Sequence, residues 1–146
     1  MGVQAMRKPR AIIYDDEIVI VQMLERYFSK RGYEVLSYTE PNVCPLYEKC
    51  ADSCTELNPC GDIVLTDLRM PKMTGIELLQ RQAQRGCKID TRNKAIMSAQ
   101  FADEDERRIA GLDCSLFEKP FQLAVISNWI NECEKRFDLS RPLTTH

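Results

Sequence analysis

The sequence has no apolar run of about 18 residues, the length that a membrane-spanning helix needs. It also lacks a leader in which a charged start precedes an apolar stretch and a small-residue cleavage site. Basic and acidic residues nearly balance, 20 against 22, which leaves no electrostatic footprint for a nucleic-acid backbone. We therefore predict a cytoplasmic protein that binds neither membranes nor nucleic acids.

Histidine is almost absent, because the one histidine, His146, is the last residue, so no imidazole ligand is expected in a metal site. Cysteine, in contrast, is abundant, with seven residues in a chain of 146. In a reducing compartment such a count indicates metal binding, redox chemistry or simple burial before structural disulfides.

Short apolar segments alternate with amphipathic segments along the chain. The alternation predicts one α/β domain with a five-stranded parallel sheet and helices on both faces. We place this domain at residues 8–138, followed by a loose tail at 139–146, with no output domain. The predicted strands are 11–15, 34–38, 62–68, 94–99 and 114–119, and the predicted helices are 18–31, 75–85, 103–111 and 123–137. The segment before the third strand is either a short helix at about Pro45 to Leu57 or an irregular excursion over the sheet edge that sulfur holds in place.

Chemically active side chains stand at the carboxyl ends of four predicted strands, where ligands bind in open parallel sheets. They are Asp15 and Asp16, Asp67, Ser98 and Lys119. Three carboxylates at one edge repel one another unless they share a proton or hold a hard cation through oxygen. Together with a lysine, they describe a magnesium site beside a carboxylate nucleophile that can take up a phosphoryl group.

These residues belong to four motifs, YDDE at 14–17, TDLRMPKMTGIELL at 66–79, MSA at 97–99 and EKPF at 118–121. With them the chain resembles the receiver domain of two-component response regulators from about Arg10 to Phe137. The resemblance implies a flavodoxin-like (βα)5 fold with strand order 2-1-3-4-5, in which Gly75 permits the tight return of the loop after Asp67. It also implies a cis peptide between Lys119 and Pro120.

By the same resemblance Asp67 is the phosphorylated residue, and Ser98 and Lys119 contact the phosphoryl group. Asp16 and Asp67 ligate Mg²⁺ directly, Asp15 does so directly or through water, and the main-chain carbonyl of Arg69 adds a further ligand. The partners implied are a sensor histidine kinase or phosphotransfer protein and a downstream protein target. The module acts as a phospho-acceptor switch that hydrolyses its own acyl phosphate slowly, and Arg69 and Gln100 either tune that hydrolysis or are ordinary exposed polar residues.

Two features depart from the family pattern. The first is the switch aromatic, which in relatives stands three residues before the lysine, where this chain has Leu116. Phe117 follows one position later, and successive strand residues point to opposite faces. We therefore expect a modified or missing aromatic switch.

The second departure is a cysteine-rich stretch, PNVCPLYEKCADSCTELNPCGD at 41–62, which occupies the place of the second helix. Three readings of Cys44, Cys50, Cys54 and Cys60 stay open: a Zn²⁺ or iron–sulfur site, a disulfide or redox pair, or burial as small apolar residues. An unbroken helix would separate Cys44 from Cys60 by about 24 Å and exclude a shared metal. The alternative function is thus a metal- or thiol-redox-sensing module on the same scaffold. Cys87 is a candidate extra ligand or disulfide partner, whereas Cys114 and Cys133 are expected in the core.

Overall fold

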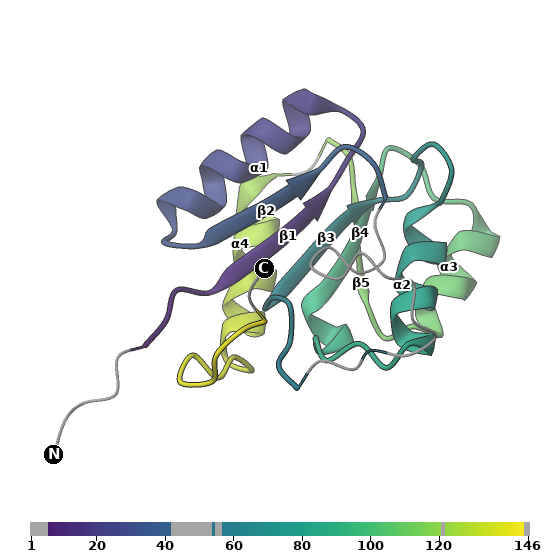
Figure 1. The fold of residues 1–146 in the computed structure, drawn as a ribbon. Coiled ribbons are helices and arrows are strands. Elements are labelled where there is room, and N and C mark those ends of the chain that lie inside the picture. Colours follow the sequence, from purple (N-terminus) through teal and green to yellow (C-terminus); the bar gives the residue numbers. More distant parts are fainter. Residues whose placement is uncertain (1–5, 42–53, 55–56, 121, 145–146) are drawn as a thin grey trace, which may run out of the picture.

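The structure is a computed structural model that describes residues 6–41, 54, 57–120 and 122–144. A five-stranded sheet forms its centre (Figure 1). All strand pairs are parallel and the order is β2-β1-β3-β4-β5, which confirms the predicted fold class. The strands are β1 (Arg10–Tyr14), β2 (Glu34–Tyr38), β3 (Ile63–Asp67), β4 (Lys94–Ser98) and β5 (Ser115–Glu118).

Among the described residues, two helices pack on each face of the sheet (Figure 1). One face carries α1 (Ile18–Lys30) and α4 (Leu123–Glu134), the other carries α2 (Gly75–Gln84) and α3 (Asp103–Ala110), and a 3₁₀ turn, η1 (Thr91–Asn93), leads into β4. The predicted limits of these four helices lie within three residues of the observed ones. None of the helices described is both long enough and apolar enough to span a membrane.

The core consists of two layers because alternate strand residues point to opposite faces. In β1, Ala11 and Ile13 join the layer beneath α1 and α4, whereas Ile12 and Tyr14 join the layer beneath α2 and α3. Strands β3 and β4 repeat the pattern, and all five residues of each of these three strands are buried. Such burial on both faces explains why the sequence shows nearly continuous apolar runs there.

The alternative of a short helix at about Pro45 to Leu57 is not supported at its C-terminal end, where the described residues are irregular. Cys54 has no regular secondary structure and Leu57 lies in a bend. The remaining positions of that prediction lie outside the described residues.

The expectation of a loose tail is wrong for residues 139–144. Leu143 and Thr144 are buried, and the backbone N–H of Thr144 donates to the carbonyl of Pro59 at 2.9 Å. The buried guanidinium of Arg10 donates to the carbonyl oxygens of both Cys60 and Thr144, each at 2.9 Å. The tail therefore packs against the start of β1 and the segment that precedes β3.

Candidate functional site

The predicted site residues meet at one edge of the sheet because the parallel strands end there together. β3 ends with Asp67 and β4 ends with Ser98. Asp15 follows β1, and its N–H donates to the carbonyl of Tyr38 at the end of β2 at 3.1 Å. Lys119 follows β5, and its N–H donates to the carbonyl of Ser98 at 2.8 Å. Backbone hydrogen bonds thus hold neighbouring strand ends in register at the site.

The three carboxylates come close enough to share a cation. One oxygen from each of Asp15, Asp16 and Asp67 lies within 4.8 Å of the others. Asp15 and Asp67 are buried, whereas Asp16 is exposed and keeps the cluster open to solvent. Oxygen donors of this kind suit a hard divalent cation such as Mg²⁺. No other group of three or more histidine, cysteine or acidic side chains comes this close in the part of the chain that the structure describes.

Lys119 neutralises part of this negative charge. Its ammonium nitrogen lies 2.8 Å from Oδ2 of Asp15, 3.2 Å from Oδ1 of Asp67 and 3.8 Å from Oε1 of Glu17. Burial lowers the pKa of Lys119, but hydrogen bonding and charge attraction from Asp15 and then Asp67 outweigh it, so the net shift is upward. Lys119 is therefore a fixed cation at the site.

Asp67 carries an unusual pKa for a carboxyl group. Burial, followed by the charge of Asp15, raises the pKa of Asp67 to about 6, against the opposing influence of Lys119. A carboxylate with few water contacts that lies next to a fixed cation has the environment of a nucleophile for phosphoryl transfer.

Ser98 lies at the site, but its hydroxyl is directed into the loop that follows β4. Oγ donates to the carbonyl of Gln100 at 2.8 Å and accepts from the N–H of Gln100 at 3.3 Å. Gln100 itself is exposed, as is Arg69, whose guanidinium lies 3.5 Å from a carboxylate oxygen of Asp105 on α3. Arg69 and Gln100, the two residues predicted to tune hydrolysis of the acyl phosphate, thus lie at the exposed rim of the site. The role of the Arg69 carbonyl as a metal ligand stays a prediction.

Gly75 is required by close contact with the nucleophile's own backbone. A Cβ atom at this position would lie 2.4 Å from the carbonyl oxygen of Asp67, far inside van der Waals contact. The N–H of Gly75 donates to the carbonyl of Leu68 at 2.8 Å, which folds the loop back onto β3. Sequence reasoning identified the residue, but the close approach explains why it must be glycine.

Sequence reasoning missed two residues that support the site. The buried hydroxyl of Thr66 donates to the carbonyl of Asp67 at 3.0 Å, and the N–H of Glu17 donates to Oδ1 of Asp15 at 2.9 Å. Both residues lie inside the motifs quoted above. Their residue types alone, however, do not distinguish a position that supports the site from one that does not.

The predicted placement of Leu116 and Phe117 on opposite faces of β5 is confirmed, and the modified or missing aromatic switch stays a prediction. Phe117 is 9% exposed and joins the core layer under α4, where its ring meets that of Trp129 edge to face at 5.4 Å. Leu116 is 36% exposed and lies on the opposite face of β5. Phe117 therefore does not replace the aromatic residue that is missing at position 116.

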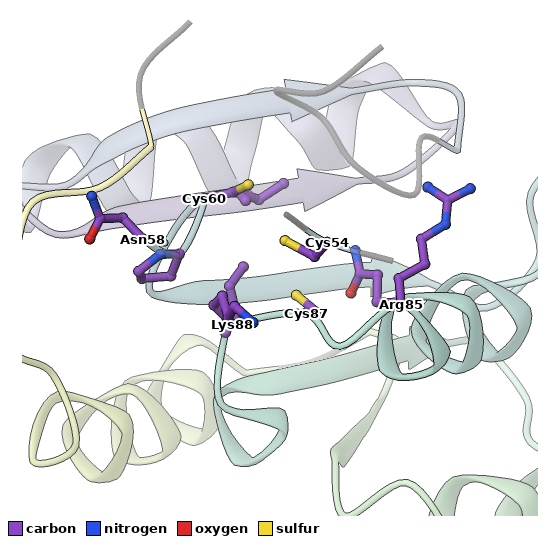
Figure 2. A pocket seen from close by; sticks show the side chains of 10 residues that line it. Cys54, Asn58, Cys60, Arg85, Cys87 and Lys88 are labelled. Carbon is purple, nitrogen blue, oxygen red and sulfur yellow. The ribbon is translucent and has the colours of Figure 1, made fainter. Parts of the chain in front are cut away.

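The cysteine predictions are tested only in part. Cys44 and Cys50 lie outside the described residues, whereas Cys54, Cys60 and Cys87 line one pocket (Figure 2). Cys54 and Cys87 are free thiols, and nothing in the described ranges supports a zinc or iron–sulfur centre. Cys133 is fully buried as expected, and Cys114 is partly buried against the layer under α2 and α3.

Comparison with known proteins agrees with this geometry. The chain is 30% identical over 106 residues to the transcriptional regulatory protein AruR of Pseudomonas aeruginosa, which covers 73% of this chain but only 40% of AruR. It is 30% identical over 132 residues to the response regulator receiver protein CpdR of Brucella abortus, which covers 86% of this chain and 94% of CpdR.

Among solved structures, the receiver domain of the Francisella response regulator 1452 has the same fold, with a TM-score of 0.70 at 20% identity over 88% of this chain and 98% of that one. The family model of the response regulator receiver domain matches residues 11–131. This chain therefore belongs to the response regulator receiver domain family.

Proposed function

We propose that Asp67 takes a phosphoryl group from a phosphohistidine on a sensor histidine kinase or phosphotransfer protein. The observation that carries this proposal is the position of Asp67, which lies 3.2 Å from the Lys119 ammonium and within 4.8 Å of two further carboxylates at the carboxyl edge of the sheet. Membership of the receiver family supports the same assignment.

The transfer uses the carboxylate of Asp67 as the nucleophile. An Oδ atom attacks phosphorus, the bond from phosphorus to the donor imidazole nitrogen breaks, and the imidazole leaves with that electron pair. Lys119 stabilises the negative oxygens of the group in transit, because its charge is already fixed at the site. Asp15, Asp16, Asp67 and the carbonyl of Arg69 would hold Mg²⁺, and this ion would supply further positive charge against the phosphoryl oxygens.

Ser98 connects phosphorylation to a change in shape. Its hydroxyl now donates to the carbonyl of Gln100. To donate to a phosphoryl oxygen instead, it must give up that bond, which releases the loop between β4 and α3. The altered loop and α3 are then the surface that a downstream protein recognises.

The phosphorylated state ends by slow hydrolysis within the domain itself. Arg69 and Gln100 lie at the exposed rim, where they limit the approach of water to Asp67. The domain therefore acts as a switch, and residues at its rim set the lifetime of the phosphorylated state. It turns over no external substrate other than the phosphoryl donor.

The proposal is tested by mass spectrometry of the intact chain after incubation with acetyl phosphate and Mg²⁺. Wild type should gain the mass of one phosphoryl group, and Asp67→Asn should gain none while remaining folded. Asp103→Asn, which alters an exposed acid on α3, is the matched control and should label like wild type. Labelling of Asp67→Asn to the wild-type extent would show that the nucleophile is another residue.

A further inference from the structure

Three cysteines from two separate segments line one pocket at the edge of the sheet opposite the acidic cluster. Cys54 and Cys60 precede β3, and Cys87 lies between α2 and β4. Figure 2 shows their sulfur atoms directed toward the same space, with the sulfur of Cys54 drawn between the other two. The remaining lining includes the apolar side chain of Ile12 and the basic residues Arg85 and Lys88.

A backbone contact fixes Cys54 beside the loop that carries Cys87. The N–H of Cys54 donates to the carbonyl of Arg85 at 2.6 Å, two residues before Cys87. The loop is in turn fixed to its helix, since the N–H of Cys87 donates to the carbonyl of Gln82 at 3.0 Å. Two chain segments that are remote in sequence are thus joined at the two thiols.

The pocket thiols differ from the thiol of Cys133 in their access to solvent and reagents. Cys54 and Cys87 are partly exposed free thiols, whereas Cys133 is fully buried. Burial is the main cause that raises the pKa of both Cys114 and Cys133 to about 11, which keeps these two thiols protonated and unreactive.

We propose that Cys54 and Cys87 are a redox-modification site that a hydroperoxide converts into an intramolecular disulfide. The thiolate of Cys54 attacks one peroxide oxygen, so an S–O bond forms, the O–O bond breaks and the departing oxygen is protonated to water or an alcohol. The thiolate of Cys87 then attacks the sulfenic sulfur, the S–S bond forms, and hydroxide leaves and is protonated to water. The two thiols lose two electrons, the peroxide gains them, and a dithiol reductant reverses the change.

The disulfide would tie the segment before β3 to the loop before β4. A disulfide pair needs only two sulfur atoms in reach, whereas a metal site would need three or four gathered around one point, and the three pocket thiols are not gathered within 4.8 Å of one another. Among the described residues, the pocket therefore offers thiols for pairwise oxidation and no gathered set of metal ligands. Because the pair lies at the far edge of the sheet, its oxidation does not depend on the acidic cluster.

The test uses the reduced full chain treated with one equivalent of hydrogen peroxide, blocked with iodoacetamide and digested with trypsin without reduction. Cleavage after Lys49, Arg69, Arg85 and Lys88 yields peptides 50–69 and 86–88. Wild type should give these two peptides joined by a disulfide, and a dithiol reductant should separate them. Cys54→Ser and Cys87→Ser should lose the joined species, and Cys60→Ser and Cys114→Ser should keep it.

Persistence of the joined peptides in Cys54→Ser would overturn the proposal, since another thiol of peptide 50–69 would then be the partner. Oxidation that yields only cross-linked dimers would also overturn the proposal. So would zinc that is bound stoichiometrically in the purified protein and protects the thiols from peroxide. Asp67→Asn should oxidise at the wild-type rate, so the result stands or falls separately from the phosphorylation experiment.

Discussion

The ammonium nitrogen of Lys119 lies 2.8 Å from Oδ2 of Asp15, a carboxylate that is fully buried at the end of β1. The same nitrogen reaches Oδ1 of Asp67 at 3.2 Å, so one cation spans the first and third strands of the chain. The acidic edge of the sheet is therefore held together by this cation before any phosphoryl group arrives, and the site depends on it for stability as well as for chemistry.

Removal of this cation should destabilise the fold. Lys119→Met keeps the length of the side chain but leaves the buried carboxylates without a counter-charge, which should cost about 3 kcal/mol of unfolding free energy. Added Mg²⁺ should recover part of the loss, because a divalent cation satisfies the same carboxylates. Urea unfolding with and without Mg²⁺ measures both effects. Lys72→Met, at an exposed pair 3.8 Å from Glu40, is the control and should change little.

The cation site itself is tested best at Asp16. This carboxylate is exposed, so Asp16→Ala should leave stability nearly unchanged while it removes a direct ligand. We expect the affinity for Mg²⁺ to fall at least about tenfold, the range seen when groups around a bound metal are altered. Calorimetric titration of wild type and variant provides the measurement, with Asp103→Asn as an acidic control away from the cluster. Equal affinities in wild type and Asp16→Ala would remove Asp16 from the ligand set.

The loop after β3 should not tolerate even one added methyl group. In Gly75→Ala the new Cβ would meet the carbonyl oxygen of Asp67 at 2.4 Å, and relief of that clash should cost roughly 1–3 kcal/mol and displace Asp67. Gly111→Ala is a matched control, because its Cβ would lie 3.5 Å from the nearest atom, the carbonyl oxygen of Arg108. Urea unfolding should separate the two variants clearly, and phosphoryl uptake should fall only in Gly75→Ala. Equal stability would show that the loop can move aside.

The acidic edge of the sheet could be predicted from the sequence because the spacing of apolar residues distinguishes strands from helices. Alternating apolar runs fix which residues form strands, and the parallel arrangement then brings the ends of those strands together without any long-range information. The same rule of alternation separated Leu116 from Phe117 correctly. The rule does not reveal distances, however, and the contact of Gly75 with the Asp67 carbonyl or the bond from the Thr66 hydroxyl depends on a loop path that no period encodes.

Irregular segments were predicted less well, for a physical reason. A proline near the start left a short helix at about Pro45 to Leu57 open beside an irregular segment. Cys54 is held by a bond from its N–H to the carbonyl of Arg85, which a helical repeat would not provide. The tail after the last helix has few apolar residues and looked loose. It is held instead by hydrogen bonds to Arg10 and Pro59, partners that lie far away in sequence.

Acid should weaken the contact between α1 and α4. Glu134 accepts hydrogen bonds from the guanidinium of Arg31 at 2.8 Å and from the hydroxyl of Tyr33 at 2.7 Å, and chiefly the bond from Arg31 lowers the pKa of Glu134. A carboxyl group whose pKa is lower in the folded state stabilises the fold above its unfolded value. That contribution is lost as the pH falls through the folded pKa.

Glu134→Gln should therefore be less stable than wild type at neutral pH, and the difference should shrink below about pH 4.3, the ordinary value of a glutamate side chain. Urea unfolding across a pH series gives the comparison, and Glu132→Gln, whose exposed carboxylate pairs with Lys135, is the control. If the difference in unfolding free energy between Glu134→Gln and wild type stays constant down to strongly acidic pH, protonation of Glu134 is not linked to stability in this way.

The C-terminal tail should contribute to stability although it follows the last helix. Truncation after Asp138 removes Leu143, which is 8% exposed, together with the carbonyl of Thr144 that accepts from the buried guanidinium of Arg10. Loss of a buried leucine and of a bond to a charged group should lower the unfolding free energy by about 3–6 kcal/mol, since each contributes roughly 1.5–3 kcal/mol. Truncation after Thr144 keeps both contacts and should leave the urea midpoint unchanged. If both truncated chains unfold at the wild-type midpoint, the tail contacts have no net effect on stability, because solvation of the exposed guanidinium then fully replaces them.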